Sequence, residues 1–272
     1  MKSVKCIFIL IVFWQLQTFA SNNNLPLGAR SAALGGASVT LNDLWSTQNN
    51  QAGLARIDTI EIGVYAERKF MLPQLGYNAF SGVLPIKGGT FGLSYSRFGY
   101  NKYNENKIGL AFAKKLGENF SAAVQLDYLS KFIGDNYGKS GTIAAEFGVQ
   151  AKLVKGLFVG AHVFNPTRAK SADYNKEKIP TIIKIGANYV FSDKVFWAVE
   201  AEKDINYKPI FKTGIEYRVI PQFYLRAGIS TQPTLSSFGF GLRLKQINLD
   251  VAATYHQQLG FTPHLGFSYR IK

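Results

Sequence analysis

Side-chain polarity alternates with a period of two from about residue 57 to the C-terminus, and this feature constrains the fold more than any other. The segment from Ile247 to Tyr255 has apolar residues at odd positions and polar or small residues, including Asp250, at even positions. Successive side chains of a β-strand point to opposite faces, so this pattern predicts strands with one apolar and one polar face. Roughly fourteen stretches of about ten residues repeat it, which is typical of a transmembrane β-barrel.

A soluble β-sandwich is the alternative, because its strands also alternate but bury their apolar face in a core. In this chain the apolar face is large and aromatic, whereas the other face carries glycine, alanine and scattered charges. Such a polar face suits the lumen of a barrel better than a solvated outer surface. The sequence therefore favours an apolar face against lipid.

The connections between the expected strands alternate in length, as the periplasmic turns and external loops of outer-membrane barrels do. With the first two strands at 57–68 and 75–86, each even-numbered strand is followed by two or three turn-forming residues. The other connections are mostly longer, near 98–106, 131–141 and 165–180, with shorter ones near 203–208, 231–234 and 257–260. We predict an all-β, antiparallel transmembrane β-barrel of about 14 strands over residues 56–272, with both ends at the periplasm.

The N-terminus has the pattern of a secretion signal. Lys2 and Lys5 precede an apolar run, and Ala20 ends a small-residue cleavage site, so residues 1–20 are predicted to be a signal peptide. Cys6, the one cysteine, lies in this segment, which predicts a mature chain without disulfides. No later segment has eighteen apolar residues without charge, which argues against a membrane-spanning helix. We expect the protein in the bacterial outer membrane.

Residues 21–55 precede the first strand and lack its alternation. They are rich in glycine and alanine, which allow close approach of the backbone. A barrel of about fourteen strands is too wide for its own side chains to fill. We therefore predict that 21–55 is an N-terminal plug, or hatch, in the lumen.

Three short elements in this segment resemble the hatch of the PorV/PorQ family, which is related to the FadL-like long-chain fatty-acid transporters. They are Gly28-Ala29-Arg30, Gly35-Gly36-Ala37 and Asn50-Gln51-Ala52-Gly53-Leu54. The resemblance covers about 30 residues, and the chain departs from it at Gln51, where the family pattern usually has proline.

The resemblance implies an outer-membrane protein of Bacteroidota and two kinds of function. The first is a non-enzymatic accessory or platform for a secreted or surface protein, as in type IX secretion, and the second is passive FadL-like uptake of a small hydrophobic solute. FadL-like uptake relies on long apolar external loops, whereas the longest loop here, 165–180, is polar. We therefore expect the accessory role first and uptake as the alternative.

Strand parity predicts which charged side chains face the lumen. Inward acidic and basic residues are near balance, which suggests ion pairs that hold the plug, with unpaired solvated charges as an equally simple interpretation. The predicted inward residues are Glu61, Glu67, Asp127, Glu146, Glu200, Glu202, Glu216 and Asp250 with Lys115, Lys152, Lys184, Lys212, Arg218, Arg226, Arg243 and Arg270.

Removing Lys2 and Lys5 with the signal peptide takes the net charge from +14 to +12, and this surplus then falls mainly on loops, turns and strand ends. Rim lysines are expected to reach lipid phosphates and lipopolysaccharide. A nucleic-acid partner is the other meaning of a basic chain, but no recognition motif accompanies it. His162, His256 and His264 have no nucleophile motif or metal-ligand spacing beside them, so we expect no catalytic site, no metal and no cofactor.

Overall fold

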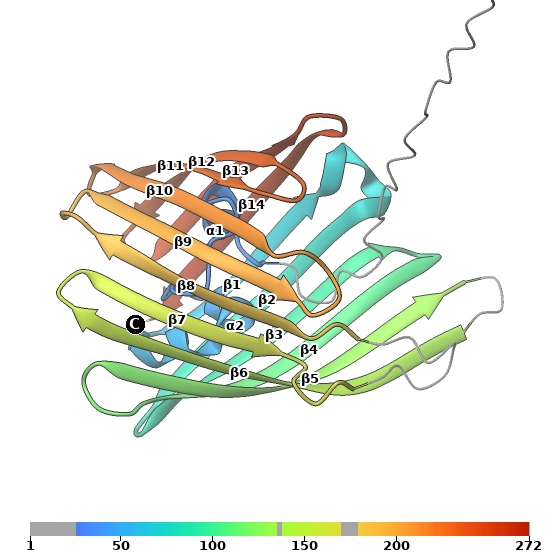
Figure 1. The fold of residues 1–272 in the computed structure, drawn as a ribbon, viewed down its shortest axis with the longest axis horizontal. Coiled ribbons are helices and arrows are strands. Elements are labelled where there is room, and N and C mark those ends of the chain that lie inside the picture. Colours follow the sequence, from blue (N-terminus) through green and yellow to red (C-terminus); the bar gives the residue numbers. More distant parts are fainter. Residues whose placement is uncertain (1–25, 135–137, 170–178, 272) are drawn as a thin grey trace, which may run out of the picture.

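The computed structural model describes residues 26–134, 138–169 and 179–271, which form a closed antiparallel barrel (Figure 1). The expected signal peptide, residues 1–20, lies outside the described residues, as do the first five residues of the expected plug. The all-β barrel predicted from alternation is confirmed.

Each strand pairs with its neighbours in sequence, and β1 pairs with β14 to close the cylinder, beginning with Ile60 opposite Ile271. Within the described residues there are fourteen strands. They are β1 (Ile60–Arg68), β2 (Gly76–Ile86), β3 (Gly89–Tyr100), β4 (Tyr103–Lys115), β5 (Phe120–Ile133), β6 (Gly138–Val154), β7 (Leu157–Phe164), β8 (Ile182–Val190), β9 (Val195–Asp204), β10 (Ile210–Ile220), β11 (Phe223–Ser230), β12 (Leu235–Leu244), β13 (Ile247–His256) and β14 (Gly260–Ile271).

Burial alternates along the strands as the sequence pattern requires. In β1, Ile62 and Val64 point outward and are exposed, whereas Glu61, Tyr65 and Glu67 point inward and are buried. The outward face of the barrel is a continuous apolar surface, which a soluble protein would have to cover. This face is the lipid-contacting surface of the barrel.

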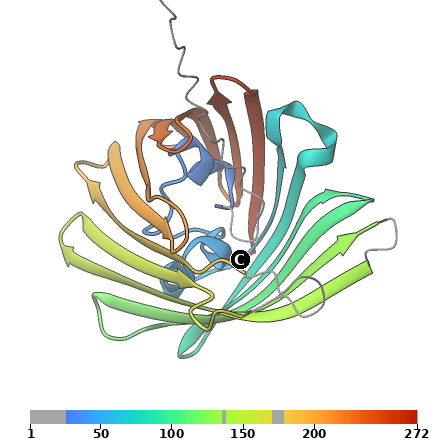
Figure 2. The same ribbon diagram turned by 45° about the vertical axis from the view of Figure 1, so that its right-hand side comes forward.

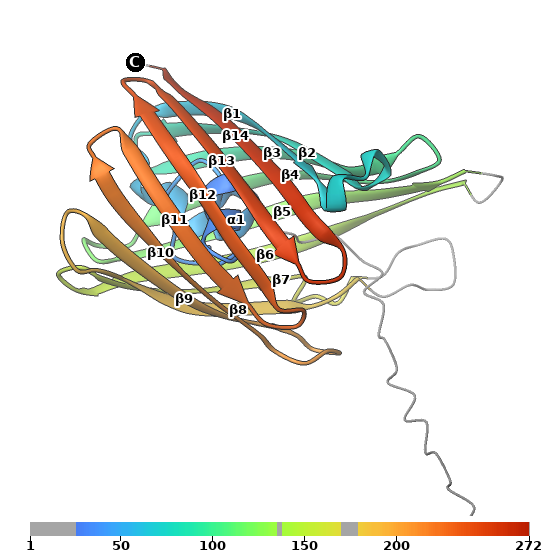
Figure 3. The same cartoon turned by 90° about the horizontal axis from the view of Figure 1, so that it is seen from above.

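The wall is taller on one side than the sequence indicated. The connections expected at 98–106 and 131–141 are shorter than predicted, because β3 and β4 pair as far as Tyr100 opposite Tyr103, and β5 and β6 as far as Ile133 opposite Gly138. The β5–β6 hairpin projects beyond the neighbouring strands (Figure 3). Polar residues such as Asn104 and Glu105 suggested a loop, but both lie within β4 and are buried.

The N-terminal segment lies inside the barrel (Figure 2). It contains two short helices, α1 (Ala29–Ala33) and α2 (Ser46–Asn49), and the 3₁₀ helix η1 (Gln51–Arg56). Helix α1 packs against β11 to β14, α2 against β2 to β4, and η1 against β3 to β6. Leu27, Leu34 and Leu54 are completely buried. Two further 3₁₀ turns, η2 (Lys69–Met71) and η3 (Pro73–Leu75), connect β1 to β2.

No helix in the described part of the chain is long and apolar enough to cross a membrane.

Candidate functional site

The plug and the inward wall around it form the candidate site, and the Gly-Ala-Arg element lies where one part of the plug packs tightly against another. Gly28 has a φ of +100°, and a Cβ there would lie 2.5 Å from the Trp45 ring. Ser31 Oγ donates to the Leu27 carbonyl at 2.8 Å and stabilises the short helix. Glycine is required at position 28 for both conformation and space.

Arg30 projects from α1 into a buried group of charges. Its Nε and Nη2 donate to the two carboxylate oxygens of Glu216 on β10, each at 2.9 Å, and its Nη1 lies 3.2 Å from Asp43. Burial alone would lower the pKa of Arg30, but the carboxylates of Glu216 and Asp43 outweigh it and hold that pKa above its ordinary value. Glu216 also accepts from Arg226 Nε at 2.6 Å, and Arg226 pairs with Asp250 at 2.5 Å. The plug is thus joined to three strands through one ionic network.

The Gly-Gly-Ala element brings plug backbone against wall backbone. Gly35 has a φ of +68°, and a Cβ there would lie 2.7 Å from the backbone nitrogen of Ile229. Directly after it, the N–H groups of Ser38 and Val39 both donate to one oxygen of Glu200, each at 2.7 Å. Lys212 bonds Glu200 at 2.9 Å and so balances its charge. This side of the plug therefore combines backbone contact with a buried charge.

The Asn-Gln element lies against the opposite wall. Asn50 Nδ2 donates to the Val39 carbonyl at 2.7 Å, and Gln51 Nε2 donates to Glu146 on β6 at 2.6 Å. Glu146 also accepts from Lys107 and lies 2.8 Å from His162 Nε2. The residue that departs from the family pattern thus supplies a side-chain bond to the wall that proline would lack.

The structure places most of the predicted lumen charges inside. Nine of the residues are buried, namely Glu61, Glu67, Asp127, Glu146, Lys184, Glu200, Lys212, Glu216 and Arg226, whereas Glu202, Arg243, Asp250, Lys152, Arg218 and Arg270 are half-buried. Lys115 is exposed at the end of β4, outside the buried network. Glu105 and Lys107 are buried inward charges that the sequence analysis missed. It assigned Glu105 to the connection at 98–106, and it left Lys107, the first residue after that connection, out of the lumen set.

Aromatic side chains gather on the inward face near the external end of the barrel. Tyr65 on β1 lies edge-on to Tyr77 on β2, with 6.1 Å between ring centroids, and stacks on His264 at 6.2 Å. Phe98, at the external end of β3, belongs to the same buried apolar cluster, and Tyr103 packs against it. This external aromatic cluster is buried and packs against the plug, since the Trp45 ring centroid lies 5.9 Å from that of Tyr65.

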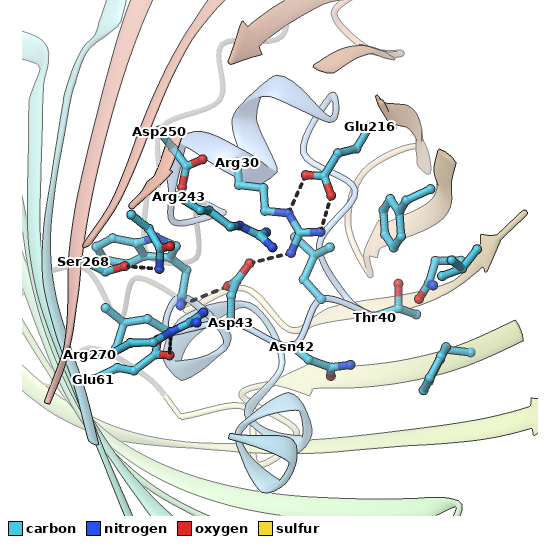
Figure 4. Close-up of a pocket in the computed structure, with 18 residues that line it drawn as sticks. Arg30, Thr40, Asn42, Asp43, Glu61, Glu216, Arg243, Asp250, Ser268 and Arg270 are labelled. Atoms are coloured by element: carbon cyan, nitrogen blue, oxygen red, sulfur yellow. Dashed lines mark hydrogen bonds and ion pairs between the residues drawn. The ribbon is translucent and has the colours of Figure 1, made fainter. Parts of the chain in front are cut away.

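A polar cavity of about 290 Å³ occupies the periplasmic end of the lumen (Figure 4). Its walls come from Arg30, from the plug loop at 40–45 and from residues within four positions of the periplasmic ends of β1, β7 to β10 and β12 to β14. Arg30, Asp43, Arg243, Arg270 and Asp250 point toward it, and Phe158 and Phe196 line one side.

The histidines are structural contacts. His162 bonds Glu146, and His264 lies between Tyr65 at 2.8 Å and Thr254 at 3.0 Å. His256 instead accepts from the N–H of Gln258 in its own hairpin. In the described ranges, no group of three or more His, Cys, Asp or Glu side chains is arranged to hold a metal ion.

No protein-family model matches the sequence, and no curated protein matches it. The fold is nevertheless similar to several solved structures. The CymD monoaromatic hydrocarbon channel superposes with a TM-score of 0.71 at 13% identity, covering 92% of this chain and 99% of that one. The Ralstonia pickettii toluene transporter TbuX gives 0.70 at 11% identity, with 92% and 100% covered.

A Pseudomonas aeruginosa FadL homologue gives a TM-score of 0.65 at 14% identity, with 92% of this chain and 98% of that chain covered. These likenesses establish the fold. The similar structures do not show membership of the narrower PorV/PorQ family. Over the described residues, the chain is a β-barrel of fourteen strands of the outer-membrane type, with the FadL-like fold.

Proposed function

We propose that this barrel is a plugged channel that admits a small hydrophobic solute across the outer membrane. The observation that carries the proposal is the similarity of nearly the whole chain to a monoaromatic hydrocarbon channel and a toluene transporter. This reverses the order that the sequence suggested, since uptake was the alternative there. The accessory role rested on a resemblance of about 30 residues, whereas the fold similarity extends over 92% of the chain.

The external aromatic cluster supports the proposal. Tyr65, Tyr77 and Phe98 are buried against the plug at rest, so an apolar solute would reach their rings once the plug begins to move. The rings would then supply dispersion contacts without requiring a hydrogen bond from the solute. Below them the plug fills the lumen, since Leu34, Leu54 and Trp45 are buried. Passage therefore requires the plug to move away from at least part of the wall.

Moving the plug costs free energy because it breaks the ionic contacts between the plug and the wall. Displacing α1 separates Arg30 from Glu216, and displacing the following loop exposes Glu200. Breaking a buried ion pair costs about 3–5 kcal/mol when one partner is left uncompensated. Water that enters with the solute lowers this cost, so a brief opening is compatible with a plug that is well ordered at rest.

The accessory role is the second candidate, and the same ion pairs favour it. A plug with this many buried polar bonds to the wall makes a rigid platform whose external surface could hold a secreted or surface protein. Type IX secretion and a Bacteroidota source belong to this second proposal. In either role, exposed rim lysines would contact membrane phosphates, with Lys102 at the external end near lipopolysaccharide and Lys155 at the periplasmic end near phospholipid.

A reversible cross-link between plug and wall tests the channel proposal. A Cβ built at Gly266 on β14 lies 3.6 Å from Ala29 Cβ, within the 3.5–4.5 Å or so that disulfides span. The double variant Ala29→Cys/Gly266→Cys should lock the plug under oxidising conditions and release it on reduction. We expect uptake of radiolabelled toluene by cells producing the oxidised variant to fall to the level of cells lacking the barrel, and to recover after reduction.

The single variant Ala29→Cys is the matched control, because it cannot close the bridge and should transport equally under both conditions. Equal uptake by the locked and released double variant would contradict a channel that opens through plug movement. If no form of the protein raises toluene uptake, a protein partner that co-purifies in mild detergent would support the accessory role.

A further inference from the structure

One arginine in the wall of the periplasmic cavity lacks a carboxylate partner within the described residues. Arg243 Nη1 lies 3.4 Å from the Tyr224 hydroxyl, and its guanidinium stands 4.3 Å from the centre of the Tyr224 ring. Its side chain points toward Arg30 and Asp43 across the cavity (Figure 4). A stacked guanidinium keeps its N–H donors free at the edge of the plane, where an anion can bind.

The carboxylates that line the cavity already have other arginine partners. Together with Arg226, the arginines around the cavity equal its four carboxylates in number, and Arg243 is the one of these arginines with no carboxylate within ion-pair distance among the described residues. The pairs are Arg30 with Asp43 and Glu216, Arg226 with Glu216 and Asp250, and Arg270 with Glu61.

The rest of the cavity suits a small molecule with one anionic group. Its volume of about 290 Å³ is near the lower end of ligand sites. Asn248 and Ser268, which bond each other at 3.1 Å, add polar groups beside the arginines. Phe158 and Phe196 form an apolar side.

Solvent reaches this cavity, and the surrounding rim is basic. The Arg270 side chain is 43% exposed although it pairs with Glu61. The exposed residues at this end of the barrel include six lysines against three carboxylates, an imbalance that raises the local concentration of anions. They are Lys87, Lys114, Lys115, Lys155, Lys194 and Lys245 against Asp58, Glu118 and Asp193.

We infer that this cavity binds a small oxyanion, a carboxylate or phosphate group on a soluble periplasmic solute, with Arg243 as its principal contact. The barrel wall separates the cavity from the lipid leaflet, so the ligand is a dissolved molecule rather than a lipid headgroup. The inference does not depend on hydrocarbon uptake, because the site lies on the other side of the plug from the aromatic cluster.

Calorimetric titration of the full-length protein in nonionic detergent at low salt tests the inference, with inorganic phosphate and benzoate as probes. We expect at least one probe to bind saturably and the variant Arg243→Gln to bind it at least tenfold more weakly. Lys155→Gln, which removes an exposed rim charge, should change affinity less than twofold.

A second variant keeps the inference testable if Arg243→Gln fails to fold. Asn42 is exposed in the plug loop and lines the cavity, so Asn42→Asp should fold normally and weaken binding by repulsion. Tighter binding of benzoate, lost in Phe196→Ala, would support a ligand with an apolar body, and tighter binding of phosphate would support a compact one. If neither probe saturates the wild type, or if Arg243→Gln and Asn42→Asp both bind like the wild type, the inference is wrong. None of these outcomes bears on toluene uptake.

Discussion

The plug is attached to the two sides of the barrel by different chemistry. On the side of β9 to β13, α1 and the loop after it are held by charged groups, with Arg30 on Glu216 and two N–H groups on Glu200. On the side of β3 to β6, η1 packs through Ala52 and Leu54 in an apolar cluster, and amide side chains make the polar bonds. If the plug opens for a solute, it should detach first from the side of the wall where fewer charged groups become exposed. We therefore expect η1 to detach from β3 to β6 before α1 detaches from β11 to β14.

Removing the central carboxylate of the charged side should have the largest effect. Glu216→Gln leaves Arg30 and Arg226 without the charge they share, so we expect a loss of about 3–5 kcal/mol in the free energy of unfolding. Urea unfolding in detergent micelles measures it. Glu118→Gln in an exposed periplasmic turn is the control, and equal midpoints for the two variants would contradict an ionic attachment.

The second-largest effect is expected from adding a side chain where the wall backbone touches the plug backbone on the same side. A Cβ at Gly214 would lie 2.5 Å from Leu34 Cα, so Gly214→Val should push the plug from the wall and cost about 1–3 kcal/mol. We expect faster tryptic cleavage after Arg30 and greater liposome swelling. Gly82→Ala, where the nearest atom would be 3.8 Å away, should behave like the wild type in both assays.

A smaller effect is expected on the amide side. Gln51→Leu removes one hydrogen bond to Glu146, which keeps Lys107 and His162, so the expected cost is about 1 kcal/mol. The same urea titration measures it. If Gln51→Leu destabilises the barrel as much as Glu216→Gln does, the proposed difference between the two sides is wrong.

Rim charges should matter least to stability. Lys155→Gln alters an exposed turn and is expected to change the free energy of unfolding by less than about 0.5 kcal/mol. A larger change would mean that the rim lysines take part in the structure of the barrel and do not simply face solvent and lipid.

The sequence predicted the barrel well because period-two alternation acts on every strand, and a one-residue shift would expose the whole lumen face to lipid. It predicted Glu216 and Glu200 inside for the same reason. It failed at Glu105, because a charged residue near a hairpin tip looks like part of a loop. It also missed Lys107, whose partners Asp127 on β5 and Glu146 on β6 are known only from the fold. The contact of Gly214 with Leu34 was also beyond sequence reasoning, because it depends on where the plug lies in the lumen.

The position of the N-terminal segment is the claim on which the rest depends, and disulfide formation in cells tests it most directly. Outer membranes from cells producing Ala29→Cys/Gly266→Cys should contain the cross-linked barrel in high yield, detected by mass spectrometry of the joined peptides. Ala29→Cys combined with Leu265→Cys, whose side chain faces lipid, should give none. Equal cross-linking in the two variants, or none in either, would contradict a plug seated inside the barrel.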